Sequence, residues 1–144
     1  YLARYSNEFR GDVRAAVLWL SARQGVRPEA IGIVGASLGA NLAMLASADL
    51  PSVRALALLS PSLDYRGLRA DSAVLKQIGS RAIWLAAASD DPYALRSVKT
   101  IAAEGSGSRE QRLVTGQAHG TRMLGADAEL GRALVDWLRR SLLS

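Results

Sequence analysis

The sequence predicts an α/β fold, a parallel sheet of about four strands with helices on both faces. Apolar runs of strand length alternate with helix-forming segments along the whole chain, and this rhythm is typical of parallel sheets. The runs at residues 55–59 and 82–88 are continuously apolar, as in strands that are covered on both faces. The 144 residues suffice for one core, so we expect a single domain over residues 1–144.

The first third of the chain predicts a helix, a strand and a second helix. Apolar side chains recur at three- and four-residue spacing over residues 7–22, and Gly25 marks the end of this amphipathic helix. The β-branched run at residues 30–35 predicts the first strand. Residues 38–48 are mostly Ala, Leu and Met, which favour a helix, and the Asp-Leu-Pro sequence at 49–51 ends it.

The middle of the chain predicts two buried strands with a short helix between them. Residues 53–59 and 81–88 are nearly all apolar, which indicates strands of the sheet interior. The polar segment at 60–67 contains Pro and Gly and predicts a loop, and residues 71–78 predict a short helix.

The last third predicts two helices around a fourth strand. Residues 93–104 follow an Asp-Asp-Pro turn and predict a helix, and the Gly-Ser segment 105–108 predicts a loop too short to link two domains. Residues 111–115 predict the fourth strand. The closing helix at 127–143 has one apolar face.

The loops that follow the four strands hold most of the chemically capable side chains. Parallel α/β sheets bind ligands beyond the carboxyl ends of their strands, so we expect these loops to meet at one edge of the sheet. They are residues 36–38, 61–66, 89–93 and 117–122.

A Gly-x-Ser-x-Gly sequence places Ser37 directly after the first strand and before the second helix. This context predicts a nucleophile elbow, a tight turn that strains the serine backbone and lifts its hydroxyl clear of the sheet. We expect Gly35 and Gly39 to be small by necessity, because residues two before and two after the serine crowd each other. The backbone N–H of Leu38 is the candidate oxyanion donor, since it lies at a helix N-terminus.

A serine nucleophile needs a base, and the base needs an acid that orients it. His119 is the single histidine of the chain and lies in a glycine-flanked loop, so it is the one candidate for an imidazole base. Asp90 and Asp91 at the end of the third strand are the candidate acids, and we expect one of them to cap the following helix. Asp64, after the second strand, is a weaker candidate.

Three spaced motifs put serine, aspartate and histidine in the order found in α/β-hydrolases. They are residues 35–40, 89–93 and 116–120. Over most of its length the chain resembles the C-terminal part of an α/β-hydrolase of the dienelactone-hydrolase-like or small serine esterase kind. In this family the acid typically lies three positions after a small residue that ends its strand, often just before proline. The resemblance therefore implies Asp91 as the acid, with Asp90 as the alternative.

The resemblance implies a serine hydrolase that cleaves carboxylic esters of small acyl groups through an acyl-enzyme. Dienelactone hydrolases proper have a cysteine nucleophile, and Ser37 in its place favours ordinary ester hydrolysis. The segment 62–80 is too short for a large lid, so we expect an open site that Leu63, Tyr65 and Tyr93 line. The alternatives are a serine peptidase or acyltransferase with the same triad, and a non-catalytic binding module of the same fold.

The resemblance also implies that the fold is partial. The family has about four more strands before the elbow strand, and the missing part includes the loop that supplies the second oxyanion N–H. The chain begins with Tyr1 rather than Met, and we expect it to be N-terminally incomplete relative to the family. The side chains of Ile31, Ile33 and Val34 then lie on an apolar strand edge, through which we expect self-association or pairing with the missing segment.

Composition argues against several other classes. The chain has no cysteine, which excludes a disulfide framework, a thiol nucleophile and a cysteine metal site. The net charge of +5 comes from arginines spread along the chain, so we expect no nucleic-acid partner. The longest apolar runs are strand-sized, so we expect no membrane partner. The predicted chemistry needs neither a metal nor an organic cofactor, and the sequence does not decide the compartment.

Overall fold

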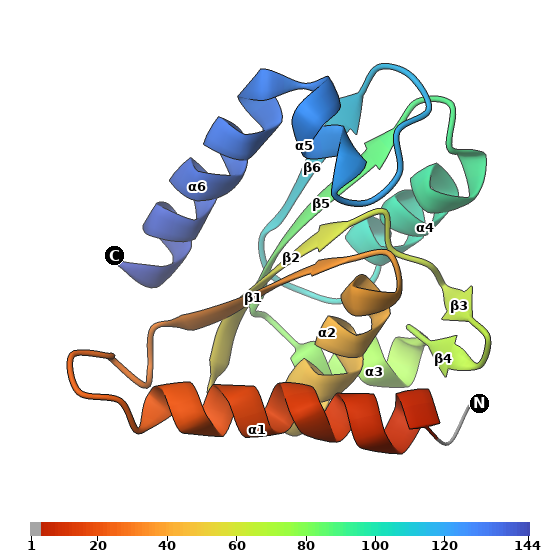
Figure 1. The fold of residues 1–144 in the computed structure, drawn as a ribbon. Coiled ribbons are helices and arrows are strands. Elements are labelled where there is room, and N and C mark those ends of the chain that lie inside the picture. The colour runs from red at the N-terminus through yellow and green to blue at the C-terminus, as the bar shows by residue number, and fades with distance from the viewer. Residues whose placement is uncertain (1–3) are drawn as a thin grey trace.

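The computed structural model describes residues 4–144, and its centre is a four-stranded parallel sheet in the order β1-β2-β5-β6 (Figure 1). All four strands point the same way, so their carboxyl ends lie at one edge, and the predicted parallel sheet is confirmed. The strands are β1 (Ile31–Ala36), β2 (Val53–Leu59), β5 (Ala82–Ala88) and β6 (Arg109–Val114).

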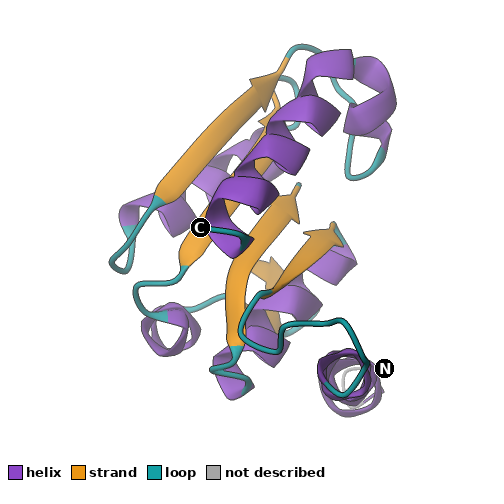
Figure 2. Ribbon diagram, turned by 90° about the vertical axis from the view of Figure 1, so that its left-hand side faces the viewer, coloured by secondary structure: helices purple, strands orange, loops and turns teal. Residues whose placement is uncertain are grey.

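Helices cover both faces of this sheet, as predicted. The helical segments are η1 (Arg4–Phe9), α1 (Arg10–Ser21), α2 (Leu38–Asp49), α3 (Ser72–Ile78), α4 (Pro92–Ala103), α5 (Arg122–Ala126) and α6 (Ala128–Leu142). The side chains of α2, α3 and α4 pack on one face, and those of α5 and α6 pack on the other. In Figure 2 the C-terminal helix α6 lies in front of the strands.

Two apolar clusters explain why the middle strands are apolar on both faces. Leu56 and Leu58 of β2 pack with Met44 of α2 on one face. On the other face, Trp84 of β5 packs with Trp137 of α6. Side chains of a strand alternate between the two faces, so a strand between two helical layers needs apolar residues at every position.

Three local features differ from the prediction. The first helix begins earlier than expected, because its first turn, Arg4–Phe9, is π-helical and runs into α1. The predicted loop after β2 contains a short hairpin of two strands with two residues each, β3 (Asp64–Tyr65) and β4 (Leu68–Arg69), whose turn has positive φ at Arg66 and Gly67. The short helix α5 was not predicted either. Elements this short have no periodic apolar pattern that a sequence can reveal.

The outer edge of β1 has no strand partner within residues 4–144, because β1 pairs with β2 alone. Val34 on this strand is 49% exposed, whereas Ile31 is buried against Val17 of α1. The expected association through this edge is not tested by the fold and stays a prediction. No helix in the described part of the chain is long and apolar enough to cross a membrane.

Candidate active site

Ser37 forms the turn between β1 and α2. Its backbone has φ 54° and ψ −121°, a conformation that costs a residue with a side chain of the order of 1–3 kcal/mol. The turn is held because the Ser37 N–H donates to the carbonyl oxygen of Leu59 at 2.9 Å. The Ser37 side chain makes no capping hydrogen bond to α2, so its hydroxyl is available to the neighbouring histidine loop.

The two glycines of the elbow are not equivalent. A Cβ atom on Gly35 would lie 2.4 Å from the carbonyl oxygen of Gly39 and 2.8 Å from the Cα of Ala40. A Cβ atom on Gly39 would meet nothing within 4 Å. The expectation that both glycines are small by necessity is therefore wrong for Gly39, because the crowding arises only where the strand residue faces the backbone of the helix.

His119 connects Ser37 to Asp91. Its Nε2 atom lies 2.9 Å from the Ser37 Oγ, and its Nδ1 atom lies 2.5 Å from the Asp91 Oδ2. A carboxylate is only an acceptor, so this contact fixes the proton on Nδ1 and leaves Nε2 free to accept a proton from the serine. The His119 side chain is 51% exposed and that of Asp91 is 19% exposed.

Asp91 makes both contacts for which the sequence offers Asp90 and Asp91 as candidates. Its Oδ1 atom accepts a hydrogen bond from the N–H of Ala94 at 3.4 Å and caps α4, while Oδ2 contacts His119. The Asp90 side chain is exposed and has no hydrogen-bond partner within residues 4–144. Asp64 pairs instead with Arg69 at 3.0 Å. The geometry thus brings Asp91, and neither Asp90 nor Asp64, to the histidine.

Leu38 is the first residue of α2, so its N–H has no acceptor within the helix. This donor lies next to Ser37 at the positive end of the helix dipole, where negative charge is stabilised. Leu38 therefore keeps the position that the sequence predicts for an oxyanion donor.

A cavity of about 660 Å³ lies beside the histidine and is lined by Gln117, Ala118, His119 and Arg122. None of the three predicted lining residues borders this cavity, and whether they contact a substrate stays a prediction. Leu63 packs on the α2–α4 face, Tyr65 packs with a cluster that includes Leu42 and Leu68, and the Tyr93 hydroxyl contacts the backbone of Asp64. Arg122 lies at the end of the segment 117–122 that the sequence predicts at this edge, and it is the first residue of helix α5, which the sequence does not predict.

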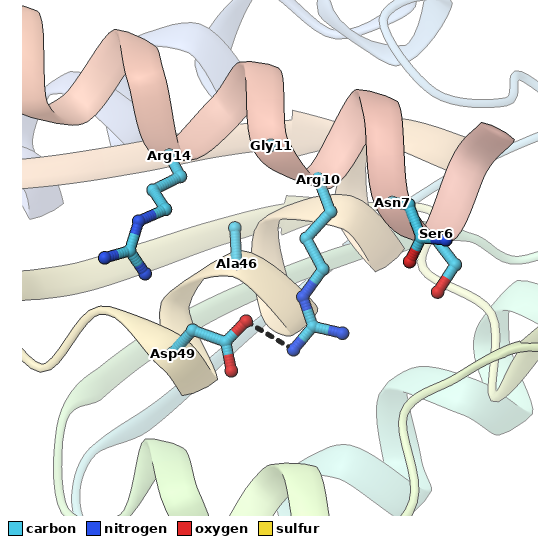
Figure 3. A pocket seen from close by; sticks show the side chains of 7 residues that line it. All are labelled: Ser6, Asn7, Arg10, Gly11, Arg14, Ala46 and Asp49. Carbon is cyan, nitrogen blue, oxygen red and sulfur yellow. Dashed lines mark ion pairs between the residues drawn. The ribbon is translucent and has the colours of Figure 1, made fainter. Parts of the chain in front are cut away.

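A second cavity, of about 440 Å³, lies between α1 and the C-terminal end of α2 (Figure 3). Arg10 and Asp49 face each other there, with 2.6 Å between the guanidinium nitrogen and the carboxylate oxygen. This ion pair joins the two helices at the end of α2 opposite to Ser37, so the cavity is separate from the candidate site. Among the described residues, no group of three or more His, Asp and Glu side chains could hold a metal ion.

A family model described as the alpha/beta hydrolase fold matches residues 8–122. A search among curated proteins finds no significant match to the sequence. Similar solved structures include a dienelactone hydrolase from Anabaena variabilis (17% identity, TM-score 0.79) and the esterase domain of a Rhodothermus marinus protein (19%, 0.73). Another is a thermostable carboxylesterase cloned from a metagenomic library (20% identity, TM-score 0.65).

These alignments cover most of this chain but only part of the other proteins. They include 95%, 92% and 92% of this chain, and 61%, 69% and 62% of the dienelactone hydrolase, the esterase domain and the carboxylesterase. The chain thus spans about three fifths of the dienelactone hydrolase. At these identities the likeness concerns the fold.

Proposed function

The chain belongs to the α/β-hydrolase fold family, and we propose that it is a serine hydrolase that cleaves carboxylic esters of small acyl groups. The resemblance to α/β-hydrolases that the sequence predicts is confirmed by this membership. The observation that carries the proposal is the continuous contact from the Asp91 carboxylate through both nitrogens of His119 to the Ser37 hydroxyl. Such a relay turns a weakly nucleophilic hydroxyl into one that attacks carbonyl carbon.

In the proposed first step, the Ser37 Oγ attacks the ester carbonyl carbon while His119 Nε2 takes the hydroxyl proton. Asp91 holds the imidazole orientation and stabilises the imidazolium that forms. The Leu38 N–H stabilises the negative charge on the tetrahedral oxygen. When the intermediate collapses, the carbon–oxygen bond to the alcohol breaks, the proton passes from Nε2 to the leaving oxygen, and an acyl-Ser37 ester remains.

The second step hydrolyses the acyl-Ser37 ester and regenerates the free serine hydroxyl. A water molecule attacks the acyl carbon and gives a proton to His119 Nε2, and the bond to the Ser37 Oγ then breaks. The carboxylic acid leaves, and the proton returns to the serine oxygen. Both steps use only groups of the protein and water.

The preference for small acyl groups rests on how the segment after β2 is held. The buried side chain of Asn41 donates to the carbonyl oxygens of Ser62 and Leu68, each at 2.9 Å, and accepts from the Ser62 N–H at 3.1 Å. The hydroxyl of Ser97 accepts from the N–H of Leu63 at 3.2 Å. A segment tied down in this way has little freedom to close over the site as a lid, so the proposed site stays open and suits small acyl groups.

The test combines substrate turnover with covalent labelling. We expect an initial burst of p-nitrophenol from p-nitrophenyl acetate, slower turnover of the palmitate ester, and labelling of Ser37 by a fluorophosphonate probe. Ser37→Ala and His119→Ala should abolish the burst and the labelling. Ser47→Ala is the matched control, because Ser47 is buried and its hydroxyl has no partner among the described residues.

Each alternative gives a different result in the same assays. A folded chain that binds neither acyl group nor probe covalently would contradict the proposal and favour a binding module. A peptidase would cleave the matching anilide at a rate near that of the ester. An acyltransferase would pass its acyl group to an added alcohol faster than to water.

A further inference from the structure

Three serines occupy equivalent places at the carboxyl edge of the sheet. Ser37, Ser60 and Ser89 are the residues that directly follow β1, β2 and β5. Each continues the sheet ladder, since its N–H donates to a carbonyl oxygen of the next strand at 2.9, 2.8 and 2.8 Å. The proposed function uses only the first of these hydroxyls.

The Ser60 hydroxyl is bound to the residue that follows the histidine. Ser60 is 1% exposed, and its Oγ accepts a hydrogen bond from the N–H of Gly120 at 2.8 Å. The same hydroxyl faces the Met123 sulfur at 4.0 Å as donor. Ser60 also has φ 52°, a backbone region that favours glycine. A serine that keeps this strained conformation is a sign of a specific task for its side chain.

The Ser89 hydroxyl holds the other end of the same loop. Its Oγ accepts a hydrogen bond from the N–H of Gly116 at 3.0 Å, and the carbonyl oxygen of Gly116 accepts from the N–H of Asp90 at 2.8 Å. The loop from Gly116 to Gly120 is therefore hydrogen-bonded at its first residue to Ser89 and at its last residue to Ser60, and His119 lies next to the Ser60 end.

We propose that Ser60, together with Ser89, is a positioning residue that keeps the His119 loop over Ser37. This inference rests on the proposed function, because it concerns the base of that reaction. About half of the His119 side chain is exposed, so packing alone does little to hold the ring. Proton transfer needs hydrogen-bond distance, and a displacement of about 1 Å can cost roughly 100-fold in rate.

The experiment removes the hydroxyl in two ways. Ser60→Ala keeps the backbone constraint, and Ser60→Gly relieves it, so the glycine variant still folds if the alanine variant does not. Both variants should lower kcat by about 10- to 100-fold, with KM close to that of the parent. Ser47→Ala, the buried-serine control, should change neither. Ser89→Thr should keep the activity that Ser89→Ala loses, because threonine retains the hydroxyl.

A second readout follows the histidine itself. His119 is the only histidine, so the ¹H–¹³C spectrum of the tag-free protein contains a single imidazole Cε1 signal. We expect this signal to broaden or split in both Ser60 variants and to stay sharp in Ser47→Ala. An unchanged signal in folded Ser60→Gly, or an unchanged kcat in an active protein, overturns the inference. A changed signal in a protein whose parent has no esterase activity supports the positioning role while contradicting the proposed function.

Discussion

The substitution Gly35→Ala should damage both the stability and the reactivity of the protein, whereas Gly39→Ala should damage neither. The alanine Cβ at position 35 would lie 2.4, 2.7 and 2.8 Å from three backbone atoms of residues 39 and 40. Carbon atoms prefer separations of about 3.5–4.0 Å, so the first turn of α2 has to retreat by about 1 Å. Overpacking of this kind costs about 3 kcal/mol at the upper end of the usual range, which is roughly 100-fold in the folding equilibrium.

The same displacement moves the Ser37 hydroxyl away from His119, so the reaction with a fluorophosphonate should slow by about 100-fold. At position 39 a new methyl group meets no atom within 4 Å. Alanine there removes a glycine from a helix, which should stabilise the protein by about 0.5–1 kcal/mol. Urea unfolding measures the free energies, and the probe gives the rate constants. Equal behaviour of the two variants, or a Gly35→Ala protein as stable and reactive as the parent, would refute this reasoning.

Three further predictions concern the carboxylate next to His119, the arginine that precedes β5, and the open edge of the sheet at β1. Asp91→Asn should slow p-nitrophenyl acetate hydrolysis by about 10³- to 10⁴-fold with little change in the urea midpoint, because asparagine still caps α4, while Asp90→Asn should match the parent. Arg81→Met should lower the free energy of unfolding in urea by about 2–4 kcal/mol, because the guanidinium of Arg81 donates to five carbonyl oxygens. This guanidinium is partly buried, and desolvation lowers its pKa. The control Arg27→Met, at an exposed turn, should leave the free energy of unfolding unchanged. Val34→Lys should reduce self-association by light scattering, because a charge on an open edge opposes strand pairing, and a parent that is monomeric at high micromolar concentration would contradict the association.

The main elements could be predicted because the order of apolar and polar residues in each one agrees with which of its sides are covered by other elements. The run at residues 53–59 agrees with β2 at both ends, since every position there is buried except Arg54. The start of the first helix could not be predicted, because residues 4–9 are π-helical and do not follow the three- and four-residue spacing by which an α-helix is identified. The hairpin β3–β4 depends on positive φ at Arg66, a conformation for which arginine gives no signal.

The site was less predictable than the fold, because neighbouring residues in one turn have the same local sequence. Asp90 and Asp91 follow the same strand, and only the three-dimensional turn decides that Asp91 points at the histidine while it caps α4. The elbow glycines have identical roles in the motif, yet only one faces backbone. Ser60 does have a sequence signal, because a serine directly follows each of the apolar runs that end at residues 36, 59 and 88.

The three members of the relay differ in how firmly the fold holds them, and this difference predicts where the chemistry is most fragile. Ser37 is fixed by the strand ladder and the start of α2. Asp91 is fixed as the cap of α4. His119 belongs to no helix or strand, and its backbone is tied to the sheet only through its loop neighbours. On the proposed mechanism, the rate should therefore depend more on the hydroxyl of Ser60 than on packing changes of similar size in the core, because the hydrogen bond from Gly120 to Ser60 lies next to His119 and helps to set its distance from Ser37.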